Sequence, residues 1–219
     1  MAEQAKEREW VRVVIAIVFV VSVVALFSYL FSDRSATTMT VTPGFKVELK
    51  DSFNRRSGSI EAGSKTPDWK AIRGSWSVAA GAAFVSGPAP LVNIVVVEAN
   101  ANASVKALVS GRGYCGVIAN YVNESDYLTL VRIEKYGIWN LEHRVNGTPR
   151  VLATVGGSQA VALTASIILD PPIVTATIGD KHVSVSISDL AAGSSAGLYA
   201  ADPNPSECAF DDMVISRPN

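Results

Sequence analysis

Two acidic residues close together in the sequence, Glu124 and Asp126, come nearest to the spacing of a pair of catalytic carboxyl groups. Retaining hydrolysis of a glycosidic bond requires two carboxyl groups about 5 to 5.5 Å apart, which a Glu-x-Asp-x-x-Glu strand would supply. Here Thr129 stands in place of the final carboxylate, and the run around Glu124 is typical of a polar turn. The sequence also lacks a His-Glu-x-x-His zinc motif. We therefore predict that the chain is not an enzyme and holds no metal and no cofactor.

Four aromatic side chains gather in one stretch of sequence and form a candidate ligand-binding face: Tyr121, Tyr127, Tyr136 and Trp139. A sugar-binding site needs such apolar surfaces beside a few hydrogen-bonding groups, which Asn120, Asn123 and Arg132 could provide. The alternative is that Trp139 points into the core, because it shares the strand parity of Leu141. The same parity predicts that His143 is a partly buried, hydrogen-bonded imidazole.

Hydrophobic residues make up 48% of the 219 residues, and their excess is concentrated in residues 13–31, none of which is charged. As a helix this stretch would be about 28 Å long, which matches the hydrocarbon core of a bilayer. It is longer than the apolar part of a cleaved signal peptide, and no small-x-small cleavage site follows it. We predict one uncleaved transmembrane helix. The net charge of -1 argues against a nucleic-acid partner.

The basic residues predict how this helix is oriented in the plasma membrane. Lys6, Arg8 and Arg12 precede it, whereas Arg34 is the basic residue that closely follows it. Because basic residues favour the cytoplasmic side, we expect the N-terminus inside and everything after residue 32 outside. A stripe of small residues on one helix face could pack against a partner helix, although scattered small residues also arise by chance in such helices: Ser22, Ala25 and Ser28.

The two cysteines, Cys115 and Cys208, both fall on the outer side of the membrane in this topology. Thiols tend to pair in an oxidising compartment, so we expect a disulfide between them. The alternative is two buried thiols whose Cα atoms lie too far apart to be bridged.

The rest of the chain has the sequence pattern of an all-β protein. Apolar and polar residues alternate in 173–188 around a Gly179-Asp180 turn, and Asn146-Gly147 marks a second hairpin. Many short runs of this kind, without an amphipathic helix, predict an antiparallel sandwich or barrel. We therefore divide the chain into a cytoplasmic segment, a membrane helix, a polar tether and one outer domain, with the boundaries 1–12, 13–31, 32–44 and 45–219.

Three segments carry a resemblance to a known fold. Asp51-Ser-Phe-Asn-Arg stands near the start of the domain, a W-x4-G-x-W-x-V-x2-G pattern begins at Trp69, and Gly197-Leu-Tyr and Phe210-Asp-Asp-Met-Val-Ile stand near its end. This arrangement resembles the concanavalin A-like, or laminin-G-like, jelly-roll domains over nearly all of 45–217. Some such domains hold a structural calcium ion, which the resemblance would place near Asp51 and Asp211. The alternative, which we favour, is that these acidic residues are solvated or hydrogen-bonded to turn amides.

The overall plan is similar to the anchored sandwich subunit of mycobacterial MCE-type lipid transporters. This similarity implies an accessory or assembly subunit of a bacterial envelope complex, which contacts other membrane-protein subunits through its helix and its sandwich. The alternative is a lectin-like module that binds cell-wall glycans, because one sandwich fold hosts many functions.

Overall fold

The computed structural model describes the five segments 44–62, 67–133, 137–156, 160–201 and 205–218. The predicted cytoplasmic segment, membrane helix and tether, including the stripe Ser22, Ala25 and Ser28, lie outside the described residues, and so does Tyr136. Among the described residues, no helix combines the length and the apolar character needed to cross a bilayer.

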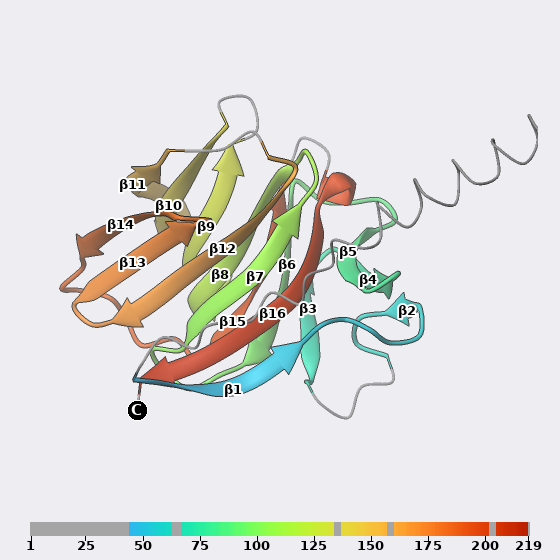
Figure 1. Ribbon diagram of the computed structural model, residues 1–219, viewed down its shortest axis with the longest axis horizontal. Helices are drawn as coiled ribbons and strands as arrows, with labels where there is room; N and C mark the ends of the chain where they lie inside the picture. The colour runs from blue at the N-terminus through green and yellow to red at the C-terminus, as the bar shows by residue number, and fades with distance from the viewer. Residues whose placement is uncertain (1–43, 63–66, 134–136, 157–159, 202–204, 219) are drawn as a thin grey trace, which may run out of the picture. The chain divides into compact units, whose positions relative to one another are not determined.

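The described residues form two antiparallel sheets that pack face to face as a jelly-roll β-sandwich, as predicted for this domain (Figure 1). The nine-stranded sheet has the order β14-β13-β12-β7-β16-β5-β4-β2, and β1 pairs with β16. Its strands are β1 (Phe45–Asp51), β2 (Gly58–Ser59), β4 (Ser75–Ala79), β5 (Ala82–Ser86), β7 (Ser104–Ser110), β12 (Ala162–Asp170), β13 (Ile173–Ile178), β14 (Lys181–Ser186) and β16 (Ala209–Pro218).

The seven-stranded sheet lies behind the first in Figure 1 and has the order β11-β10-β9-β8-β15-β6-β3. Its strands are β3 (Trp69–Arg73), β6 (Val92–Glu98), β8 (Tyr114–Asn123), β9 (Asp126–Ile133), β10 (Ile138–Val145), β11 (Thr148–Val155) and β15 (Ser195–Ala201). A short 3-10 helix, η2 (Pro205–Glu207), precedes β16.

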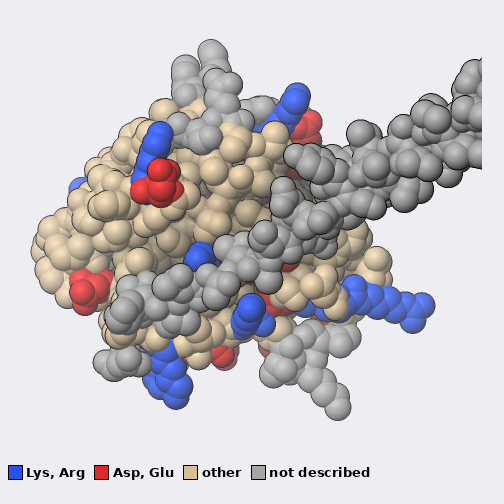
Figure 2. Space-filling model, viewed as in Figure 1, with Lys and Arg blue, Asp and Glu red and all other residues tan. Residues whose placement is uncertain are grey.

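Alternation of side chains along each strand builds the core between the sheets. In β13, Val174, Ala176 and Ile178 are buried, whereas Thr175 and Thr177 are half-buried on the outer side. Because successive residues of a strand point to opposite faces, this pattern places one side of β13 in the core. Figure 2 views the molecule from the side of the nine-stranded sheet and shows charged side chains scattered over that face rather than gathered in one patch.

The hairpin turns follow from residues that tolerate a left-handed backbone. Asn146 and Gly147 join β10 to β11 with φ angles of 50° and 78°, which asparagine and glycine adopt at low cost. Gly179 has a φ of 58° in the connection between β13 and β14. Both turns lie where the sequence predicts them.

A disulfide joins the two sheets. Cys115 in β8 and Cys208, which directly precedes β16, are bonded with a Cα–Cα distance of 5.4 Å, and both side chains are fully buried. This separation lies within the range that a disulfide requires. The bond therefore fixes the start of β8 in the seven-stranded sheet to the start of β16 in the other sheet.

Asp51, the first residue of the Asp-Ser-Phe-Asn-Arg segment, acts as a hydrogen-bond acceptor at the end of β1. Its carboxylate accepts hydrogen bonds from the backbone N–H of Phe53 at 2.8 Å, from Nε1 of Trp69 at 2.8 Å and from the Arg55 guanidinium at 2.8 Å. Within the described segments, no three His, Cys, Asp or Glu side chains converge as metal ligands. These donors give Asp51 a structural role, because its carboxylate holds together the end of β1, the following turn and the start of β3.

His143 on β10 is 3% exposed, and its Nε2 atom lies 3.7 Å from Oδ1 of Asp126. Burial lowers the pKa of His143, an effect that the Asp126 carboxylate opposes and the Arg150 guanidinium reinforces. The unfolded chain then takes up a proton at a higher pH than the folded chain does. The contribution of neutral His143 to the free energy of unfolding is therefore present in full above about pH 6.5. It decreases by up to about 1.4 kcal/mol per pH unit as the pH falls from there to the pKa of His143 in the folded chain.

We expect the free energy of unfolding to fall between pH 7.5 and pH 5, and to fall less in His143→Gln. Urea titrations monitored by circular dichroism at a series of pH values measure this difference. His182→Gln serves as the matched control, because His182 is exposed on β14. Equal pH dependence in His143→Gln and in the unmodified protein would contradict the expectation.

Candidate functional site

The side of the seven-stranded sheet that faces away from the core carries an unusual surface, which we call the outer face. A second cluster of buried apolar residues lies there, separate from the core between the sheets. Its members come from β6, β8, β9 and β15: Ile94, Val96, Ile118, Tyr121, Tyr127, Val131, Tyr199 and Ala201. Because an outward sheet face is usually polar and solvated, this packed apolar cluster on the side away from the core makes the outer face a candidate for binding.

Three tyrosines form the centre of this surface, and we call Tyr121, Tyr127 and Tyr199 the tyrosine cluster. The rings of Tyr121 and Tyr127 stack with centroids 5.8 Å apart and an interplanar angle of 27°. Burial raises the pKa of Tyr121 and of Tyr199 to about 12 in each case. All three phenols therefore stay neutral at physiological pH and can donate a hydrogen bond.

Two charged residues of β10 lie beside the tyrosine cluster. The guanidinium carbon of Arg144 lies 5.5 Å from the ring centroid of Tyr127, within the range of a cation–π contact. Burial raises the pKa of the Glu142 carboxyl, and this effect is opposed by a hydrogen bond from Asn140 and by the charge of Arg144. The outer face therefore combines aromatic rings with a cation and a partly buried carboxyl group.

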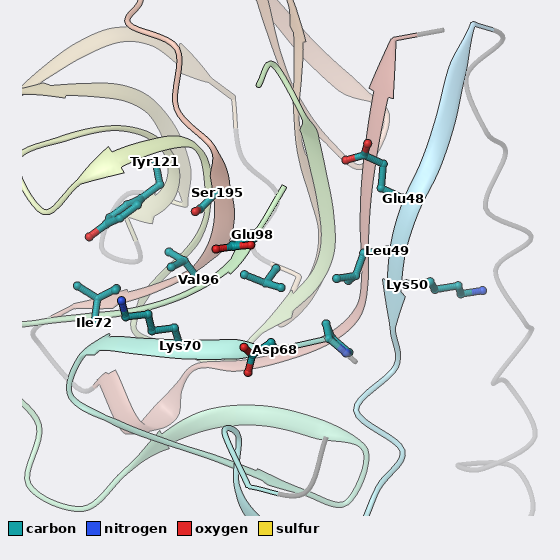
Figure 3. Close-up of a pocket in the computed structure, with 12 residues that line it drawn as sticks. Glu48, Leu49, Lys50, Asp68, Lys70, Ile72, Val96, Glu98, Tyr121 and Ser195 are labelled. Carbon is teal, nitrogen blue, oxygen red and sulfur yellow. The ribbon is translucent and has the colours of Figure 1, made fainter. Parts of the chain in front are cut away.

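A groove of about 600 Å³ opens at the edge of the outer face, beside β1 and β3. Figure 3 shows Tyr121 and Ser195 on one side of this space and Lys70 and Ile72 of β3 on another. Glu98 of β6 lies between these two pairs. The lining residues are Glu48, Leu49, Lys50, Pro67, Asp68, Lys70, Ile72, Val96, Val97, Glu98, Tyr121 and Ser195. The volume falls in the range of small-ligand sites.

The polar side chains of the groove differ in whether they already have partners. Glu48 accepts hydrogen bonds from the backbone and side chain of Asn100 and pairs with Arg217 at 3.2 Å. The exposed side chains of Lys70 and Glu98, in contrast, have no hydrogen bond or ion pair within the described part of the chain. They are therefore available to a ligand in the groove.

The predicted ligand face is only partly assembled by the structure. Tyr121 and Tyr127 lie together on the outer face, as the candidate site requires. Trp139 does not: its side chain is fully buried in the core between the sheets, because its strand parity directs it inward, and it cannot touch a ligand on the outer face. Tyr199, which the sequence analysis omitted, takes part instead; its alternation with the core residue Leu198 on β15 was the signal that could have identified it.

Ser195 is a second residue that the sequence analysis missed. It stands at the centre of Gly193-Ser-Ser-Ala-Gly197, which has the Gly-x-Ser-x-Gly spacing of a serine-hydrolase nucleophile. That motif requires a sharp turn from a strand into a helix. Ser195 instead begins β15 and pairs with Glu98 and Tyr121 on the neighbouring strands. Its hydroxyl therefore lines the groove as a polar group of a sheet and lacks the setting of a nucleophile elbow.

Comparison with known proteins identifies the fold. No protein-family profile and no curated protein match the sequence. Among solved structures, carbohydrate binding module CBM66 from Bacillus subtilis has a TM-score of 0.51 at 13% identity, covering 68% of this chain and 92% of that chain. A Bacillus subtilis protein with a galectin-like fold has a TM-score of 0.56 at 11% identity, covering 80% and 100%.

A third similar structure is SCLam, a non-specific endo-β-1,3(4)-glucanase from family GH16, with a TM-score of 0.58 at 9% identity, covering 83% of this chain and 94% of that chain. This finding corrects the prediction that the chain is not an enzyme, because the same sandwich carries glycoside hydrolases as well as binding modules. The similarity to MCE-type transporter subunits gains no support from these structures, which share the fold alone.

Proposed function

We propose that this chain binds glycans on the outer face of its seven-stranded sheet, at the groove beside Tyr121. The observation that carries the proposal is the combination, at one groove, of the Tyr121 ring with Lys70 and Glu98, two polar side chains that have no partner among the described residues. Glu98 and Lys70 offer an acceptor and a donor for sugar hydroxyls, and Ile72 and Val96 offer apolar contact for the ring carbons. Ligand sites typically combine a largely apolar lining with a few polar groups in this way.

The comparisons support this proposal at the level of the fold. CBM66 is described as a carbohydrate binding module and SCLam as a glucanase, so two proteins with this sandwich interact with carbohydrate. The predicted membrane anchor remains a prediction; it would hold the domain outside the cell, close to envelope glycans. In that setting the lectin-like alternative accounts for the outer face better than a role in assembly alone, because assembly requires no groove.

Tyr121→Ala is expected to weaken glycan binding by the full-length chain in mild detergent about tenfold or more, because it removes the aromatic side of the groove. A glycan array identifies the best ligand, and isothermal titration calorimetry then measures its dissociation constant. Tyr114→Ala is the matched control, since Tyr114 lies on the same strand and also packs against the outer apolar cluster but does not line the groove.

Thermal unfolding of both variants separates loss of binding from loss of fold. Equal affinity in Tyr121→Ala and the unmodified protein, or binding by no glycan on the array, would overturn the proposal. Because glycoside hydrolases share this fold, the same incubations are also assayed for newly released reducing ends, which would show turnover in addition to binding.

A further inference from the structure

An ion pair spans the outer face next to the tyrosine cluster. Nε of Arg73, at the end of β3, lies 2.6 Å from a carboxylate oxygen of Glu124, in the turn between β8 and β9. The strands β6 and β15 lie between β3 and β8 in the sheet. The ion pair therefore joins the end of β3 to a turn that follows a strand which is not its neighbour in the sheet.

The two stacked tyrosines lie close to this ion pair. Burial raises the pKa of Tyr121, the charge of Glu124 adds to this, and the charge of Arg73 opposes it. Burial also raises the pKa of Tyr127, and there the charges of Arg144 and Arg73 both act in the opposite direction. The guanidinium group of Arg144 therefore lies over one of the stacked rings, the charge of Arg73 acts on both phenols, and Tyr121 is also part of the groove.

The ion pair is held only weakly. The side chains of Arg73 and Glu124 are 53% and 47% exposed, and exposed pairs of this kind typically contribute less than about 1 kcal/mol. A carboxylate supplied by a ligand offers Arg73 the same charge-assisted hydrogen bond and can form two of them at once. Replacing Glu124 by such a ligand therefore costs little and leaves Arg73 paired.

We propose that the ligand is an acidic glycan whose uronate carboxylate takes the place of Glu124 on Arg73 while its sugar ring lies against Tyr121. This inference rests on the proposed function and adds the chemical class of the ligand. Arg144, whose guanidinium group lies over the Tyr127 ring, adds further positive charge beside the stacked rings. A neutral glycan would leave the Arg73–Glu124 pair intact and would occupy the groove alone.

The test compares each acid with its own neutral derivative. Oligomers of galacturonate, glucuronate and mannuronate, each with its methyl ester, are titrated into the full-length chain in mild detergent. We expect at least one acid to bind about tenfold or more tightly than its ester. Arg73→Gln should abolish this difference, whereas Glu124→Gln should strengthen binding of the acid, by up to about fivefold, because it removes the competing carboxylate.

Arg112→Gln is the matched control, because Arg112 is an exposed arginine before β8, at the opposite end of that strand from Glu124. A loss of affinity for the acid in Arg73→Gln together with a gain of affinity in Glu124→Gln would not arise if the ion pair served only to stabilise the fold. If the esters bind as tightly as the acids, or if the two variants lose affinity for the acid equally, the proposal of an acidic ligand is wrong. Glycan binding itself would still hold. Binding by no uronate also overturns the proposal of an acidic ligand, and the array of neutral glycans then decides the proposed function separately.

Discussion

Loss of the disulfide between Cys115 and Cys208 is expected to lower the free energy of unfolding by about 4.6 kcal/mol. The two cysteines are separated by 93 residues, and a loop of this size restricts the unfolded chain by about that amount in the chain-entropy account. The bond also connects strands of different sheets, so reduction removes a direct link across the core. Urea unfolding of the oxidised and reduced protein, monitored by tryptophan fluorescence, measures the difference.

The variant Cys115→Ala/Cys208→Ala is the control for this experiment. It should unfold near the urea concentration at which the reduced protein unfolds, and dithiothreitol should have no further effect on it. Alanine is preferred to serine because both positions are fully buried and a hydroxyl there would need a hydrogen-bond partner. Identical unfolding midpoints for the oxidised and reduced protein would contradict the predicted stabilisation.

Local sequence patterns predict the well-alternating part of the sandwich. Apolar and polar residues alternate in β13 from Val174 to Ile178 and in β14 from His182 to Ser186, and Asn146-Gly147 marks the hairpin between β10 and β11 directly. β3 and β5 were not predicted, because Trp69–Arg73 and Ala82–Ser86 are five-residue strands without strict alternation. The pairing of β3 with β6 and of β5 with β16 depends on contacts distant in sequence, which a local pattern does not contain.

The candidate site was harder to predict than the fold, because it depends on which strands are neighbours. Tyr121 and Tyr127 are near each other in sequence and were identified, but Tyr199 joins them only because β15 pairs with β8. The Arg73–Glu124 pair requires the whole order of β3, β6, β15 and β8. A bulge in β8 between Ala119 and Asn123 also changes the alternation there, so simple parity does not give the direction of Tyr121.

Trp139→Ala is expected to lower the free energy of unfolding by about 3 to 5 kcal/mol, because it removes a large side chain from a fully buried position and leaves a cavity. Trp139→Phe should cost less, since it keeps an aromatic ring and removes the indole N–H, which has no hydrogen-bond partner in the core. Urea titration monitored by circular dichroism measures both. Val151→Ala, on the neighbouring strand β11, is the surface control because Val151 is 52% exposed, and its effect should stay within about 0.5 kcal/mol.

The two Trp139 variants also distinguish the two roles that the sequence allows for Trp139, in the core or on the ligand face. If Trp139 belongs to the core, Trp139→Phe should retain glycan affinity, because the outer face keeps the tyrosine cluster and the groove. Tyr121→Ala should then show the reverse pattern, with a large loss of affinity and a smaller loss of stability. A stable Trp139→Ala protein that no longer binds glycan would place the indole on the ligand face instead. The two substitutions therefore test, in one pair of measurements, which side of the seven-stranded sheet contacts the ligand.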